Sequence, residues 1–223
     1  NEELLKKVLS GLKKLDGQTH TYIRADFSEP EIVVKKIDSY FEGNKRIDIL
    51  VNNSGGPAPG KISEAAPKAL EEAFAQHIVA SQVITKRLIP GMKKNKFGRI
   101  INIISIGVKQ PIDNLGVSNT IRGAMASWAK TMANELAPYN ITVNSILPGY
   151  TLTPRLNYLF EERAKEQGIT PEEFANTVRR QIPAGRFADA AEIGYLAGFL
   201  ASEFASYITG INVPVDGGFL KCL

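Results

Sequence analysis

Residues 98–107, Gly-Arg-Ile-Ile-Asn-Ile-Ile-Ser-Ile-Gly, decide the fold together with the helical pattern over residues 117–137. The first stretch is a nearly continuous apolar run, which is typical of a parallel strand covered on both faces. The polar residue near its carboxyl end is Ser105. A strand, a short loop and a long helix in this order indicate one unit of an α/β protein.

Strand and helix patterns alternate along the rest of the chain. The alternation predicts a Rossmann-like, doubly wound parallel sheet in a single domain, residues 1–223. A capping box, Ser28-Glu29-Pro30-Glu31, predicts where one helix begins, and Gly168 predicts a break within another. The predicted strands cover residues 19–25, 47–51, 99–106, 142–147 and 211–215. The predicted helices cover residues 2–14, 28–41, 65–94, 117–137, 154–181 and 189–201.

Composition narrows the function classes. The chain is 43% hydrophobic and 22% charged, as expected for a globular protein. Its net charge of +4 is mild and its basic residues are scattered, so we expect no nucleic-acid partner. A single cysteine, Cys222, excludes an intrachain disulfide framework and fits a reducing, cytoplasmic location. No apolar run reaches the roughly 18 residues that span a bilayer, so we expect no membrane partner.

Small and polar residues follow four of the predicted strands. In open α/β sheets, ligands bind beyond the carboxyl ends of the strands. Four such endings in one chain therefore predict a ligand site that they share. The endings are Asp26, Asn53–Gly56, Ser105–Gly107 and Pro148–Thr153.

These motifs resemble the short-chain dehydrogenase/reductase family, most closely its 3-oxoacyl-acyl-carrier-protein reductase-like group. Asn52-Asn53-Ser54-Gly55 resembles the family's Asn-Asn-Ala-Gly signature, and Pro148-Gly149 with Thr153 matches its nicotinamide-binding element. Two further segments of this chain resemble elements that are characteristic of the group: Gly185-Arg186-Phe187 and Val215-Asp216-Gly217-Gly218. The resemblance implies that NAD or NADP binds at Asp26, Asn53, Ser54, Gly55, Pro148, Gly149 and Thr153.

The same resemblance implies hydride transfer between the nicotinamide and a small carbonyl or alcohol substrate. It further implies a substrate lid at about residues 150–181 and a homodimer or homotetramer. The apolar helices over residues 65–94 and 117–137, the latter with Met125, Trp128 and Met132, are the expected subunit contacts.

The proton-transfer residues of the family are replaced in this chain. The family's Tyr-x-x-x-Lys pair falls on Val117 and Ile121, although the spacing from Ser105 to Val117 is one residue shorter than usual. The family's catalytic asparagine falls on His77. Of the usual catalytic residues, only Ser105 remains.

Three residues near Ser105 are candidates to replace the missing groups: Ser118, Lys109 and Arg122. Ser118 is one step along the helix from Val117, and Lys109 lies on the loop after Ser105. Arg122 does not give up a proton readily, but it could hold a phosphate or a carboxylate.

The family's glycine-rich phosphate turn has no counterpart in residues 1–223. Gly56 and Gly60 have a suitable spacing, but Pro57 and Pro59 remove the N–H groups that a phosphate needs. We therefore expect a strand–turn–helix upstream of Asn1 that completes the middle of the sheet. Two function classes remain open: an oxidoreductase with an altered acid–base group, and a catalytically inactive family member that acts as a dinucleotide-binding or scaffold protein.

Overall fold

Four parallel strands form one sheet in the order β1-β2-β3-β4. The computed structural model describes residues 1–42 and 46–222. Strands β2 and β3 lie in the middle, and every residue of each is buried except the last, Ile103 or Pro148. The predicted Rossmann-like parallel sheet is confirmed. The strands are β1 (Ile49–Asn52), β2 (Gly98–Ile103), β3 (Ile141–Pro148) and β4 (Asn212–Val215).

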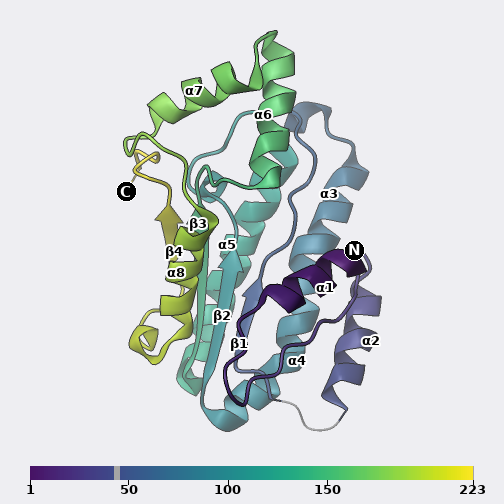
Figure 1. Ribbon diagram of the computed structural model, residues 1–223. Coiled ribbons are helices and arrows are strands. Elements are labelled where there is room, and N and C mark those ends of the chain that lie inside the picture. Colours follow the sequence, from purple (N-terminus) through teal and green to yellow (C-terminus); the bar gives the residue numbers. More distant parts are fainter. Residues whose placement is uncertain (43–45, 223) are drawn as a thin grey trace.

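Helices cover both faces of this sheet (Figure 1). Successive strand residues point to opposite faces, so neighbouring isoleucines of β2 enter different cores. Ile100 packs with residues of α4 and α5, whereas Ile101 packs with residues of α8. The helices are α1 (Glu2–Gly11), α2 (Pro30–Phe41), α3 (Pro67–Phe74), α4 (Ala80–Asn95), α5 (Gly116–Leu136), α6 (Pro154–Gln167), α7 (Pro171–Gln181) and α8 (Ala190–Ala201).

The helix expected over residues 65–94 begins two residues later and contains a π-helical turn at residues 75–79, between α3 and α4. Pro90 lies inside α4. The break near Gly168 is confirmed: this glycine ends α6 with φ of +66°, a conformation that glycine adopts at little cost. Helices α6 and α7 lie above the carboxyl end of the sheet (Figure 1).

The amino-terminal segment departs from the sequence predictions in two ways. Residues 19–25 form no strand, because a strand needs a neighbour to pair its N–H and C=O groups. The predicted capping box does not form either. The backbone N–H and hydroxyl of Ser28 donate to Asp26 Oδ1 at 2.9 and 2.6 Å, and Glu29 precedes the first residue of α2.

Strand β1 is an edge of the described sheet, and its side chains are unusually exposed. Ile49 and Val51 are 45% and 47% exposed. An apolar parallel strand is ordinarily covered on both faces. The further strand expected from the sequence to pair at this edge stays a prediction.

The apolar residues of α5 serve the chain's own core. Met125 and Met132 are 4% and 8% exposed, and the indole of Trp128 donates to Gln82 Oε1 at 2.7 Å. The structure thus corrects the expectation that the two methionines form a subunit contact.

Within residues 1–42 and 46–222, no helix is both long enough and apolar enough to cross a membrane.

The start of α5 packs so tightly that it predicts a stability effect. A Cβ on Gly116 would lie 2.7 Å from the Cα of Ile62, a backbone atom that cannot rotate away. Gly116→Ala is therefore expected to lower the free energy of unfolding by about 1–3 kcal/mol. Gly123→Ala in the same helix meets nothing within 4 Å and should be neutral or stabilising by up to about 1 kcal/mol. Urea unfolding of the two variants measures this, and equal effects would contradict the packing argument.

Candidate active site

A cavity of 740 Å³ lies at the carboxyl ends of β1, β2 and β3. Side chains from all three strand ends reach it, together with residues of α5, α6 and the start of α8. The shared ligand site expected from the strand endings is therefore present as a space. The predicted site residues that line it are Asn53, Ser54, Gly55, Ser105, Ser118, Arg122, Pro148, Gly149 and Thr153.

Ser105 is held by a local hydrogen bond that leaves its proton available. Its Oγ accepts from the backbone N–H of Gly107 at 3.0 Å, which opens a single 3₁₀ turn. The amide of Asn119 binds both backbone groups of Ile112, at 3.2 and 2.8 Å, and so ties the following loop to α5. A fixed Ser105 hydroxyl can donate into the cavity.

The face that α5 presents to the cavity differs from the prediction. Val117 and Ile121 are 7% and 3% exposed and pack in an apolar cluster with Ile104 and Ile106. The cavity is lined instead by Ser118 and Arg122, one position further along. The physical reason is packing: the apolar pair is buried, and a one-residue step turns a helix by about 100°. Ser118 is also one residue further from Ser105, which removes the short spacing noted in the sequence.

Arg122 is a charged group in an enclosed position. It is 8% exposed, and its Nη1 donates to the carbonyl oxygen of Ile103 at 3.2 Å, at the end of β2. Burial, with a further effect from the nearby Arg155, lowers the pKa of Arg122 to about 10. The guanidinium is therefore charged at neutral pH.

His77 does not line the cavity itself but is hydrogen-bonded to a residue that does. It is 3% exposed, and its Nδ1 shares a hydrogen bond of 2.7 Å with the hydroxyl of Ser54, which lines the cavity. Burial, and then the charge of Arg122, lowers the pKa of His77 to about 4. Its Nε2 is buried and has no hydrogen-bond partner among the described residues. His77 is thus a neutral positioning residue for Ser54.

This lowered pKa predicts how stability depends on pH. Unfolded histidine has a pKa of about 6.5, so the unfolded chain takes up the proton first as pH falls. The contribution of His77 is complete above about pH 6.5 and is lost between about 6.5 and 4. We expect it to amount to about 2 kcal/mol, allowing for solvent screening. Urea unfolding from pH 7 to 4 should show a steeper loss for the wild type than for His77→Gln. Parallel curves would contradict the burial argument.

Lys109, one of the proposed substitutes for the missing acid–base group, is exposed and does not line the cavity. Tyr150, Arg155 and Arg163 also line the cavity, although the sequence did not assign any of them a role of its own. Tyr150 directly follows Pro148-Gly149, and this position was the signal that could have found it. Its ring packs against Phe160, Phe187 and Phe219 with centroids 5.2–6.4 Å apart, and burial raises the pKa of its phenol.

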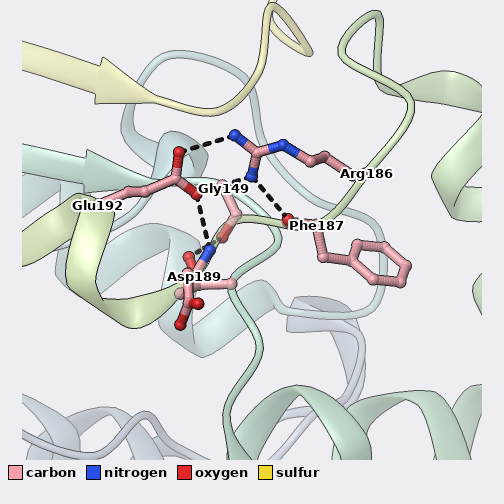
Figure 2. Close-up of polar contacts among 6 residues, drawn as sticks. Gly149, Arg186, Phe187, Asp189 and Glu192 are labelled. Carbon is pink, nitrogen blue, oxygen red and sulfur yellow. Dashed lines mark hydrogen bonds and ion pairs between the residues drawn. The ribbon is translucent and has the colours of Figure 1, made fainter.

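The loop after α7 is fixed to the start of α8 by a fork of charged contacts (Figure 2). Arg186 donates to both carboxylate oxygens of Glu192 at 2.7 and 2.8 Å, and the backbone N–H of Asp189 donates to the same carboxylate at 2.8 Å. The pair with Arg186 lowers the pKa of Glu192 to about 2. Ala188 in turn bonds the backbone of residues 150 and 152, so this loop braces the cavity wall.

Asp26 lies in a second cavity, of 920 Å³, which shares Asn53, Ser54 and Gly55 with the first. A Cβ added at Gly55 meets nothing within 4 Å, so the backbone at the junction is open to a ligand. Hydrogen bonds from Ser28 hold the pKa of the Asp26 carboxyl below its usual range. Two spaces that meet at an open backbone fit the two halves of a dinucleotide.

This fold, with a cavity at the ends of its parallel strands, defines an α/β protein of the dinucleotide-binding type. The chain belongs to the short-chain dehydrogenase/reductase family: the family model described as enoyl-(acyl carrier protein) reductase matches residues 1–220.

Curated relatives and solved structures agree with this family. The NADPH-dependent reductase BacG of Bacillus subtilis is 37% identical over 178 residues, which is 80% of this chain and 69% of that protein. The D-beta-hydroxybutyrate dehydrogenase of Rhizobium meliloti is 32% identical over 96% of this chain and 84% of its own. The crystal structure of YwfH, an NADPH-dependent reductase involved in bacilysin biosynthesis, has a TM-score of 0.89 and 32% identity. It covers all of this chain and 85% of its own.

Proposed function

We propose that this chain is an NAD(P)-dependent oxidoreductase that transfers a hydride between a nicotinamide and a carbonyl or alcohol group of a small molecule. One observation carries the proposal. The hydroxyls of Ser105 and Ser118 and the guanidinium of Arg122 line the same cavity as the residues that resemble the family's nicotinamide-binding element. NADPH in the names of BacG and YwfH supports this cofactor class.

The chain's own residues would hold the cofactor along both cavities. Asp26 would contact the adenosine half, and Asn53, Ser54 and Gly55 would border the passage between the two spaces. Pro148, Gly149 and Thr153 would hold the nicotinamide half, which supplies or accepts the hydride when bound. The Thr153 hydroxyl also caps α6, because it accepts from the N–H of Leu156 at 3.3 Å and donates to the carbonyl of Thr151 at 3.2 Å. It is thereby fixed in place.

Ser118 and Arg122 would take the two positions that tyrosine and lysine hold in the family. They are four residues apart and share a helix face. The hydroxyls of Ser105 and Ser118 can donate hydrogen bonds to a substrate oxygen, and the charge of Arg122 stabilises negative charge that develops there. Because a guanidinium does not release its proton, the proton on that oxygen would come through a hydroxyl that exchanges with solvent.

A second candidate function is a family member that binds dinucleotide without turnover, as a binding or scaffold protein. One observation favours it: among the described residues that line the cavity, none is Asp, Glu, His or Lys. The polar side chains that remain are hydroxyls, the amide of Asn53, guanidinium groups and the phenol of Tyr150, whose pKa is raised by burial.

The test separates binding from turnover in the purified protein. NADPH and NADH binding is measured by fluorescence titration, and their oxidation is then followed with a panel of ketones and aldehydes. Saturable binding with oxidation that depends on the carbonyl compound supports the oxidoreductase. Binding without oxidation supports the second candidate, and no binding of either dinucleotide contradicts both.

We also propose that the protein forms a homodimer or homotetramer with a lid at about residues 150–181. The family resemblance supports the oligomer. The position of α6 and α7 above the sheet's carboxyl end supports the lid, since α6 and α7 contribute Leu156, Phe160 and Phe174 to the cavity wall.

A further inference from the structure

The charge of the cavity wall is entirely of one sign. Three arginines line it, Arg122, Arg155 and Arg163, and no acidic side chain does so among the residues that the structure describes. A ligand that enters this space therefore meets positive charge without a built-in counter-ion. The question is which arginines are free to bind it.

Arg163 already has partners. Its guanidinium donates to the backbone carbonyl of Asp113 and lies 3.5 Å from the carboxylate of Glu166. Arg122 and Arg155 differ: in the part of the chain that is described, neither forms a salt bridge. Each donates to one backbone carbonyl, that of Ile103 or Pro57. A guanidinium carries five N–H donors, so most of theirs remain for a ligand.

Arg122 and Arg155, the two lining arginines that form no salt bridge in the described chain, converge on one place. A Cβ built on Gly56 would lie 3.5 Å from Nη2 of Arg155 and 3.8 Å from Nη2 of Arg122. Gly56 has no side chain to fill this place, and it lines the cavity together with both arginines. Two like charges near one point repel each other, and the charge of Arg155 contributes to the lowered pKa of Arg122. An anion between them would relieve that repulsion.

We propose that the substrate is an organic anion whose carboxylate binds between Arg122 and Arg155 above Gly56. This inference rests on the proposed function and names the substrate class of the same site. A carboxylate matches the planar fork of a guanidinium and accepts two parallel hydrogen bonds from its N–H groups. The body of the substrate lies against the apolar wall of α6, where Leu156, Leu159 and Phe160 line the cavity.

A phosphate of the dinucleotide shares this chemistry, and position distinguishes the two sources. Arg122 reaches the carbonyl of Ile103, two residues before Ser105, so it lies on the reacting side of the cavity. The predicted adenosine contact, Asp26, lies in the second cavity. Arg122 and Arg155 line the first cavity and not the second. This position favours the substrate, rather than the adenosine half of the cofactor, as the source of the anion.

The test uses two probes of nearly the same shape that cannot react: 4-phenylbutanoate, which is charged, and 4-phenylbutanamide, which is neutral. Their binding to the purified protein saturated with NADP⁺ is measured by isothermal titration calorimetry. Three proteins are compared: the wild type, Arg155→Gln and Arg180→Gln. Arg180 is an exposed arginine of α7 that does not line the cavity, so its variant loses the same charge elsewhere.

We expect the wild type and Arg180→Gln to bind the carboxylate at least about tenfold more tightly than the amide, the range of a charge-assisted hydrogen bond. Arg155→Gln should lose most of this preference while its NADPH affinity stays within about twofold. Equal or unmeasurable binding of the carboxylate by the wild type overturns the proposal. If Arg180→Gln loses the preference for the carboxylate to the same extent, the proposal is also overturned, because the preference then reflects general charge attraction. NADPH affinity that falls in Arg155→Gln while the preference persists assigns the site to the cofactor's phosphate.

The inference and the proposed function fail separately. A wild type that prefers the carboxylate but oxidises NADPH with no carbonyl compound keeps the anion site and contradicts the oxidoreductase. A wild type that reduces neutral ketones and binds both probes equally keeps the oxidoreductase and contradicts the anion site.

Discussion

The double variant Val117→Tyr/Ile121→Lys is expected to lose its fold. Both side chains are almost fully buried in the cluster with Ile104 and Ile106. A tyrosine ring overfills that core, and an unpaired ammonium there costs about 3–5 kcal/mol. Domains of this size are stable by only about 5–15 kcal/mol. Circular dichroism and urea unfolding measure the loss, and a variant that unfolds with the wild-type midpoint contradicts the placement of these residues.

The matched change one position along the helix should give the opposite result. Ser118→Tyr/Arg122→Lys places a phenol and an ammonium on the face of α5 that lines the cavity, with the usual spacing from Ser105. We expect this variant to fold. If a nicotinamide binds as proposed, it should reduce generic ketones about 10²–10⁴ times faster than the wild type, the contribution of a positioned acid–base group.

This pair of variants tests the register of α5 as well as the chemistry. The rate of NADPH oxidation with one neutral ketone panel is compared for both variants and the wild type. A gain in the Val117/Ile121 variant and none in the Ser118/Arg122 variant would mean that the tyrosine and lysine positions of the family fall on the buried pair.

The register of α5 shows what the sequence could and could not predict. The stripe of apolar residues at Val117, Ile121 and Met125 has the four-residue spacing of a core face. That pattern places Ser118 and Arg122 on the adjacent face, about 100° around the helix, and it was a sufficient signal. The alignment with the family's Tyr-x-x-x-Lys motif instead placed the pair one residue earlier, on Val117 and Ile121. Strand ends such as Ser105 and Asn53 were predicted because parallel strands all end at one edge.

Other features depend on contacts that no local pattern contains. Residues 19–25 have strand-like residues, but a strand requires a neighbour, and the described residues supply none there. The convergence of Arg122 and Arg155 on Gly56 joins three segments that are far apart in the chain. Only the packing of α6 against the ends of the strands brings them together, so the charge of the cavity could not be predicted from the sequence.

The variant Ser105→Ala is expected to remain folded and to lose most of its activity. The lost hydrogen bond from the N–H of Gly107 closes a single turn at a partly exposed position, so its removal should cost about 1 kcal/mol of stability. In the proposed function the Ser105 hydroxyl donates to the substrate oxygen. Loss of one such donor typically lowers kcat about 10²–10³-fold.

Three measurements separate this role from a structural one. NADPH affinity and the urea midpoint of Ser105→Ala should stay close to the wild type, while kcat with the best ketone falls and KM changes little. Ser127→Ala removes an exposed hydroxyl of α5 outside the cavity and serves as the matched control. Because the donor strengthens its hydrogen bond as the oxygen gains negative charge, the loss should appear in kcat. A loss confined to KM, or an unchanged rate, contradicts the role of Ser105 in the reaction.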